Sequence, residues 1–301
     1  MLGIGLALLS SVLWGTADFL AGLANRRAPL ITVLAGTQLA GLTLVALVLV
    51  ARGEGPPHDV RLGYAALGAV GAIVGLGALY RGLALGPMGV VAPISALSGV
   101  VPVLVGLALG ERASGLQLFG MLLSLVGVAM AAAVPSPSPG RSASWVAAGI
   151  GLLAATGIGA ALVGLGAASE AHPVWAVVVL RLAVLVALTG GLVAQLALQC
   201  GGMPGWLAFP SAGTSHFGIR HHPRWLLRVQ LVAAGTLDAG ANLLFSVAAT
   251  AGALSIVGLL GSLYPVSTVL LARFVLDERL RPLQVAGVGM VLAGVGAISL
   301  G

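Results

Sequence analysis

The chain has 301 residues, of which 59% are hydrophobic and only 7% are charged, and its formal net charge is +6, with arginine and no lysine among its basic residues. Soluble domains carry about 25% charged residues, so this composition excludes a water-soluble globular protein and indicates an integral membrane protein. The absence of lysine also excludes a P-loop ATPase, because the phosphate-binding motif of that class requires one.

Taken in chain order, the sequence contains a series of apolar runs, each near the ~20 residues that an α-helix needs to cross a bilayer. The hydrophobic residues are continuous within each run and do not alternate, so membrane β-strands are not expected. The predicted fold class is therefore all-α and integral to the membrane, with ten transmembrane helices. The predicted spans are residues 3–23, 30–51, 62–80, 88–110, 115–134, 146–168, 174–198, 227–249, 253–275 and 282–300.

Two polar stretches stand out between these runs. The first contains "PSPSPG" and is predicted to be a linker over residues 135–145, because proline, serine and glycine favour loops. The second is a long predicted loop over residues 199–225. It contains Cys200, His216, His221 and His222, but their spacing is poor for a metal site and no acidic residue is near, so no metal is expected.

The second half of the sequence repeats the first. "GIGLALLSSVLWG" begins at Gly3, and "GIGLLAATGIG" begins at Gly149. Further along, "GER" is followed by "LQLFGMLLSLVGVAM" (116–130), and "DER" is followed by "LQVAGVGMVLAGVGA" (283–297). We predict two five-helix repeats, residues 1–134 and 146–301. Because each has an odd number of spans, the two should be inverted relative to one another, as in many secondary transporters.

These paired segments resemble the EamA-type repeats of the drug/metabolite transporter superfamily. The opening "SVLWGTADF" (11–19) and the "LYP" at residues 263–265 are similar to that family as well. The resemblance implies a ten-helix exporter or importer of small metabolites, driven by protons or another gradient, or equilibrating its solute. One feature departs from the superfamily: the first-helix glutamate of its four-helix relatives aligns with Val12 and not with Asp18.

Ionisable residues inside a membrane span cost roughly 2.5–3.5 kcal/mol on insertion scales and usually mark function. The clear cases are Asp18, Arg181 and Asp238. We predict that Asp18 and Asp238 face a central cavity as a proton or cation site. The alternative is that one of them forms a structural ion pair with Arg181. The other predicted cavity residues are Trp14, Gln38, Tyr80, Asn242 and Tyr264.

Two prolines are predicted to break the fourth and ninth spans. Pro93 and Pro265 each remove a backbone hydrogen bond, and the groups that they free should lie beside the cavity or serve a packing kink. Glu111 and Glu278 fall where spans end, so they are predicted to anchor the chain at the membrane interface.

The most plausible function is a secondary transporter of a small organic metabolite that works by alternating access, with proton coupling as one option. The rival interpretations are a structural or accessory membrane subunit and an intramembrane lipid-processing enzyme. No catalytic set, cofactor or nucleic-acid partner is expected; the partners are solute, membrane lipid and a coupling ion, with the protein as a monomer or homodimer. The expected location is a cell membrane, in particular the bacterial inner membrane. Its orientation stays open, because the resemblance suggests cytoplasmic termini whereas the arginine distribution favours the reverse.

Overall fold

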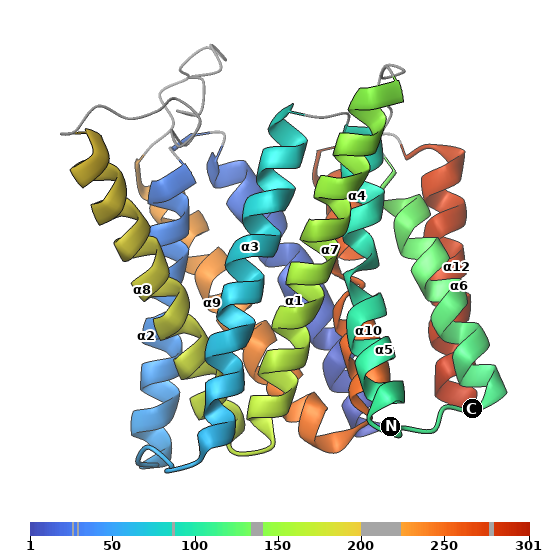
Figure 1. Cartoon of the computed structure of the whole chain (residues 1–301), viewed down its shortest axis with the longest axis horizontal. Helices are drawn as coiled ribbons and strands as arrows, with labels where there is room; N and C mark the ends of the chain where they lie inside the picture. Colours follow the sequence, from blue (N-terminus) through green and yellow to red (C-terminus); the bar gives the residue numbers. More distant parts are fainter. Residues whose placement is uncertain (26, 29, 86–87, 134–140, 200–223, 277–279) are drawn as a thin grey trace.

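The structure is a computed structural model of the chain and describes all residues except 26, 29, 86–87, 134–140, 200–223 and 277–279. The described residues form helices joined by short loops, and no strand occurs among them. Most of the helices stand side by side in one bundle (Figure 1). They are α1 (Leu2–Asn25), α2 (Leu30–Arg52), η1 (Val60–Leu62), α3 (Gly63–Leu85), α4 (Met88–Ser95), η2 (Ala96–Gly99), α5 (Val100–Ala108), α6 (Gly115–Ala131), α7 (Arg141–Ser169), α8 (Pro173–Gln199), α9 (Arg224–Ala251), α10 (Leu254–Gly261), α11 (Tyr264–Val275) and α12 (Pro282–Leu300).

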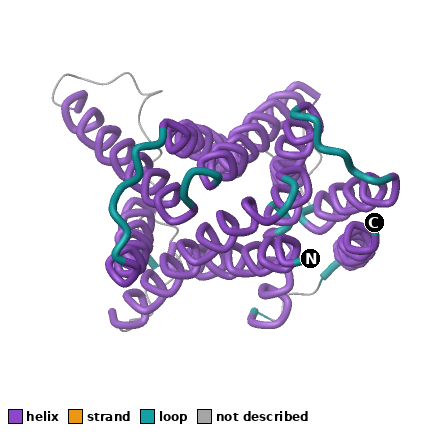
Figure 2. Tube along the Cα trace, turned by 90° about the horizontal axis from the view of Figure 1, so that it is seen from below, coloured by secondary structure: helices purple, strands orange, loops and turns teal. Residues whose placement is uncertain are grey.

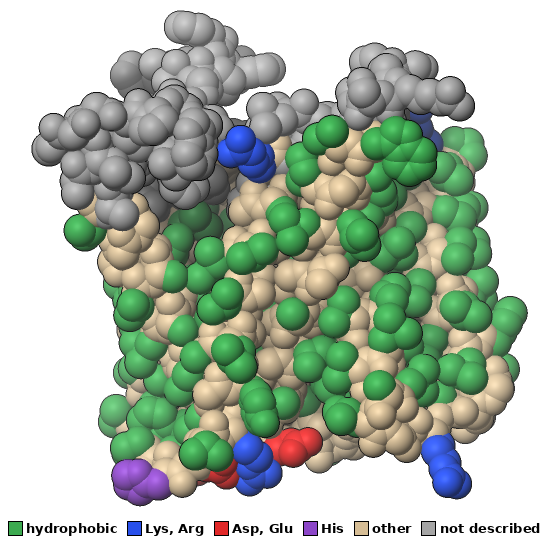
Figure 3. Space-filling view, in the orientation of Figure 1, with side chains coloured by type: hydrophobic (Ala, Val, Ile, Leu, Met, Phe, Trp, Pro, Cys, Tyr) green, Lys and Arg blue, Asp and Glu red, His purple; other side chains and the backbone are tan. Residues whose placement is uncertain are grey.

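The bundle has the dimensions and surface of a multi-pass membrane protein. Among the described residues, nine helical stretches are long and apolar enough to cross a bilayer, and Gly115–Ala131 is a shorter apolar helix. On the face seen in Figure 3, the charged side chains of the described residues lie towards the two ends, with a broad region of hydrophobic and small side chains between them. Such a surface suits hydrocarbon.

The observed helices follow the predicted spans, with two kinds of difference. The fourth and ninth spans are not single helices: they are divided into α4, η2 and α5, and into α10 and α11. In addition, α7 begins at Arg141, within the stretch predicted as linker, so the helix is longer at its start than its hydrophobicity indicates.

The break in the ninth span has a local cause. Ser262 and Leu263 separate α10 from α11, and Pro265 occupies the first turn of α11, where its missing N–H costs nothing. Pro93 instead lies inside α4, just before the 3₁₀ turn η2. Both prolines are partly buried, and their position beside a cavity stays a prediction.

Close glycine contacts hold several helix pairs together. The most extensive contacts join α3 to α7, α6 to α12 and α1 to α9. A Cβ atom on Gly71 would lie 2.8 Å from the Gly157 carbonyl oxygen, and one on Gly127 would lie 2.7 Å from that of Gly287. Such distances leave no room for a side chain. The Gly71-x-x-x-Gly75 pattern therefore serves packing within the chain, where small residues let backbones approach in lipid.

The glycines of α12 allow a matched test of this packing. A Cβ atom on Gly287 would lie 2.6 Å from the Gly127 carbonyl oxygen, whereas one on Gly289 would have no atom within 4 Å. We expect Gly287→Ala to destabilise the protein by about 1–3 kcal/mol through overpacking. Gly289→Ala should be neutral or stabilising by up to ~1 kcal/mol through helix propensity. Melting temperatures in detergent would measure both, and equal values would contradict the close α6–α12 contact.

Both termini lie at one end of the bundle, which is the lower end as drawn in Figure 1. Viewed from below, the termini are also near one another, towards one side of the bundle (Figure 2). We use "lower end" for this end and "upper end" for the opposite one, where the chain passes from α1 to α2 and from α11 to α12.

Candidate functional site

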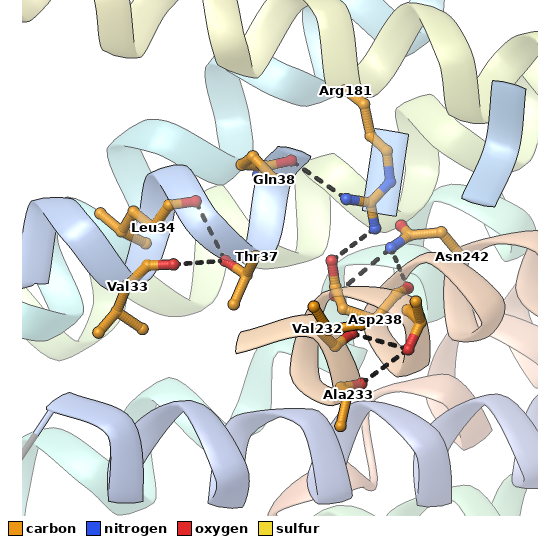
Figure 4. Close-up of polar contacts among 10 residues, drawn as sticks. Val33, Leu34, Thr37, Gln38, Arg181, Val232, Ala233, Asp238 and Asn242 are labelled. Atoms are coloured by element: carbon orange, nitrogen blue, oxygen red, sulfur yellow. Dashed lines mark hydrogen bonds and ion pairs between the residues drawn. The ribbon is translucent and has the colours of Figure 1, made fainter. Parts of the chain in front are cut away.

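The polar groups in the interior are organised around Arg181 of α8. Its Nη2 atom donates to Oδ2 of Asp238 on α9 at 2.6 Å, and its Nη1 atom donates to Oε1 of Gln38 on α2 at 3.1 Å. Figure 4 shows the guanidinium lying between these two side chains. One arginine therefore joins three helices, and it pairs with Asp238, not with Asp18.

Two glycines make space for the guanidinium. A Cβ atom on Gly41 would collide with Cζ and Nη1 of Arg181 and with the carbonyl oxygen of Gly235, while Gly235 itself faces the Thr37 carbonyl. The backbones of α2 and α9 thus approach closely beside the arginine. Its side chain is 3% exposed, whereas that of Asp238 is 37% exposed. The cation is buried in a slot, and its acidic partner is accessible.

Asn242 holds Asp238 in place from one turn further along α9. Its Nδ2 atom donates to the Asp238 carbonyl oxygen at 2.6 Å and lies 3.5 Å from Oδ1 of the same residue. Asn242 is buried, so this amide supports the ion pair from within the bundle. The i, i+4 spacing that predicted a common face for the two residues is the spacing at which this contact forms.

Asp18 faces the interior of the bundle and has no hydrogen bond or ion pair to any described residue. It lies four and seven residues after Trp14 and Ser11, which places all three on one face of α1. Ser11 is buried, whereas Leu9 and Val12 on the opposite side of the helix are exposed. Yet Asp18 itself is exposed. Its carboxylate interacts electrostatically with that of Asp238 on α9.

The exposure of the interior face of α1 differs between its two ends. Below Asp18, the residues of this face are buried at Gly3, Ala7 and Ser11; above it, Gly22 and Asn25 are exposed. The ninth span follows the same pattern, since six of the eight residues of α10 are buried and only one of the twelve in α11 is. Along both α1 and the ninth span, the residues nearer the lower end are therefore more closely packed than those nearer the upper end.

An aromatic pair lies below the carboxylates, near the break of the ninth span. The ring centroids of Trp14 and Phe245 are 5.5 Å apart. A Cβ atom on Gly261 would lie 3.0 Å from the Phe245 ring and 3.3 Å from that of Trp14. Thr268 Oγ1 donates to the Gly15 carbonyl oxygen at 3.1 Å and so joins α11 to α1.

The comparison with protein families decides what kind of protein carries this site. The family model described as "EamA-like transporter family" matches residues 1–133 and again residues 145–300, which together span nearly the whole chain. The chain belongs to the EamA-like transporter family. Members of this family are membrane transporters.

Other comparisons with this EamA-family chain concern its fold. No curated protein matches the sequence. A solved crystal structure matches over 99% of this chain and 96% of its own, with a TM-score of 0.70 and 18% sequence identity. At that identity the likeness supports the fold alone.

In this EamA-family protein, the structure brings some of the predicted site residues into contact and leaves others apart. Gln38, Asp238 and Asn242 share one hydrogen-bond network with Arg181. Trp14 packs lower, and Tyr264 is partly buried at the start of α11. The side chain of Tyr80 lies outside the described part of the chain, as do Cys200 and His216, His221 and His222. No cluster of three or more acidic, histidine or cysteine side chains suited to a metal occurs among the described residues.

Three features of the site were missed in the sequence. Gly41 and Gly235, which admit the guanidinium, are two of 46 glycines and carry no distinguishing pattern. Phe245 reads as an ordinary apolar residue of its span. Glu111 was predicted as an interfacial anchor, but its Oε1 and Oε2 atoms accept hydrogen bonds from the backbone N–H groups of Leu254 and Ser255 at 2.6 and 2.9 Å. A glutamate recurs at the same place in the paired "GER" and "DER" motifs, and this repetition is the sequence signal that indicates a structural role for Glu111.

Proposed function

We propose that this protein is a secondary transporter that moves a small organic solute by alternating access. The observation that carries the proposal is the exposure of Asp18 on the interior face of α1, about 24 Å from the lower end of that helix at ~1.5 Å per residue. A carboxylate at such depth is costly unless water or solute reaches it. The denser packing of the lower half supports a central cavity that is closed below and open above, which is one of the two states that alternating access requires.

We also propose that the halves 1–134 and 146–301 are inverted repeats. The helix contacts support this idea, because the pair α3–α7 corresponds to the pair α9–α1 when each span is exchanged for the one five spans away. The helices α6 and α12 are themselves five spans apart, so the same exchange turns the pair α6–α12 into itself. Gly120 and Gly127 of α6 have Gly287 and Gly294 of α12 as counterparts 167 residues later, and each contacts the other's counterpart. Two separate matches to one family model support the same division.

Within this mechanism, Asp18 acts as the proton or cation site, and the Arg181–Asp238 pair holds α8 and α9 together beside it. Trp14, Gln38, Tyr80, Asn242 and Tyr264 are proposed to line the solute pathway. Asp18 suits the coupling role better than Asp238, since Asp238 already neutralises Arg181. The proposed location is a cell membrane, in particular the bacterial inner membrane.

The direct test is solute flux in proteoliposomes with a panel of amino acids, sugars and small organic metabolites, each with and without an imposed proton gradient. We expect uptake of at least one class above that of protein-free vesicles. If no class moves although the protein is folded, the proposal fails, and an accessory role would then explain the chain better. Hydrolysis of a lipid in the same vesicles would instead favour the enzymatic alternative.

The inverted arrangement makes a separate prediction about topology. Reporter proteins fused at the N-terminus and inserted between residues 135 and 140 should lie on opposite sides of the membrane, because five spans separate them. A pair of reporters with opposite compartment preferences would measure this in whole cells. A reporter fused at the C-terminus serves as control and should agree with the N-terminal one. Reporters at the N-terminus and in the linker that lie on the same side would exclude inverted repeats.

A further inference from the structure

At the lower end, contacts between polar side chains connect the loop after α2 to the loop after α7. Glu54 Oε2 lies 3.0 Å from His172 Nε2, and Arg61 Nη1 lies 3.8 Å from Glu170 Oε2. Both contacts join the first half of the chain to the second. The Glu54 oxygen is buried, so this contact is shielded, while the Arg61–Glu170 pair is exposed and weaker.

Glu111 makes the strongest of the cross-half contacts at this end. Its two carboxylate oxygens accept the backbone N–H groups of Leu254 and Ser255, at the start of α10. These groups have no partner within their helix, and a carboxylate is favoured there by charge and by the helix dipole. A Cβ atom on Gly106 would collide with this carboxylate, so glycine is needed for its approach. The loop after α5 is thereby fastened to the buried half of the ninth span.

The neighbouring charges keep this arrangement in place. Arg52 lies 3.0 Å from Glu54, and Arg61 lies 2.7 Å from Asp59. Hydrogen bonds from the side chain and backbone of Arg61 hold the pKa of Asp59 below its usual value, so this carboxylate stays ionised in mild acid. Asp59 in turn orients Arg61 beside Glu170.

We propose that Glu54, Glu111 and Glu170 form a latch that closes the lower end of the cavity, and that the latch releases when the cavity opens there. The inference rests on the proposed alternating access. Each glutamate contacts the opposite half of the chain, and each does so at the end where the interior face of α1 is buried. Rocking of the halves towards a lower-open state separates these partners. At the upper end, contacts between the halves among the described residues include no carboxylate: Arg27 donates to the neutral Gln230 at 2.9 Å, and Gln284 donates to the carbonyl oxygens of Ala131 and Ala133 at 3.4 and 3.2 Å.

Two cysteine reporters on the interior face of α1 test the latch without knowledge of the solute. In a Cys200→Ser background, Ser11→Cys places a thiol in the closed half, since Ser11 is 4% exposed. Gly22→Cys places one in the open half, where a Cβ atom would meet nothing within 4 Å. The measured quantity is the rate of labelling by a water-soluble maleimide in detergent. Glu111→Gln and the double variant Glu54→Gln/Glu170→Gln would be compared with Arg112→Gln, which removes an exposed charge at the same end.

We expect the double variant to raise labelling at position 11 by roughly two- to fivefold, because the Arg61–Glu170 pair is exposed and the Glu54–His172 contact is a full ion pair only when the histidine is protonated. Glu111→Gln should raise it by about tenfold, as expected for loss of a charge-assisted hydrogen bond. Labelling at position 22 should fall in the same variants, and Arg112→Gln should change neither. Unchanged labelling at position 11, or a rise at both positions, would overturn the latch. If Glu111→Gln does not fold, the Glu54→Gln/Glu170→Gln variant still decides between these outcomes. If labelling rises at position 11 and falls at position 22 but the protein moves no solute, the latch is supported and only the proposed transport function is contradicted.

Discussion

Replacing Asp238 by alanine is expected to destabilise the protein by about 3 kcal/mol. The reason is that Arg181 is 3% exposed and would be left as a buried charge without its acid, which typically costs 3–5 kcal/mol. The lower end of that range applies because Asp238 is 37% exposed and water reaches the pair. For a chain of this size the loss corresponds to about 5–10 °C in melting temperature. Thermal unfolding in detergent would measure it.

A double-mutant cycle separates the ion pair from other effects of the substitution. Arg181→Met should cost less than Asp238→Ala, since the acid that it leaves behind can be hydrated and methionine fills part of the slot. Combining the two should recover most of the stability that Asp238→Ala loses. If the double variant is as unstable as the sum of the single ones, the two residues are not energetically coupled, and the short distance between them has no energetic meaning.

Replacing Asp18 by asparagine should have the opposite profile, with normal stability and a large loss of function. Asp18 has no ion-pair partner among the described residues, and its removal relieves repulsion from Asp238, so we expect a change within about 0.5 kcal/mol. Gradient-driven uptake should fall by on the order of tenfold or more, because asparagine cannot exchange a proton or hold a cation. Parallel flux and melting experiments would measure both quantities.

Asp18→Glu supplies the conservative control. It keeps the carboxylate and should retain part of the gradient-driven uptake that Asp18→Asn loses. Full uptake by a stable Asp18→Asn protein would remove Asp18 from the mechanism. A strong loss of stability in that variant would instead indicate a partner that the structure does not describe.

The fold could be predicted in outline because hydrophobicity records what must face lipid. The ten runs correspond to α1, α2, α3, the α4–α5 unit, α6, α7, α8, α9, the α10–α11 unit and α12. Where helices begin was predicted less well. Arg141 starts α7 in a stretch that reads as linker, since a helix can extend beyond the hydrocarbon into the interface without an apolar signal.

The sequence predicted which polar residues lie in the interior but not which of them contact one another. Charge within a span identified Asp18, Arg181 and Asp238 by cost alone. Which aspartate pairs with Arg181 depends on the close approach of α2 and α9 at Gly41 and Gly235, which is a tertiary property. The contact of Glu111 with the start of α10 spans 143 residues of sequence, and nothing local specifies its partner.

The slot around Arg181 has a mechanical consequence. Side chains are absent at Gly41 and Gly235, so α2 and α9 meet backbone to backbone directly beside the guanidinium. A side chain at either position would push the two helices apart and also displace the arginine from Asp238. The distance between two helices and the pairing of one buried charge are therefore fixed at the same point, and neither can change without the other.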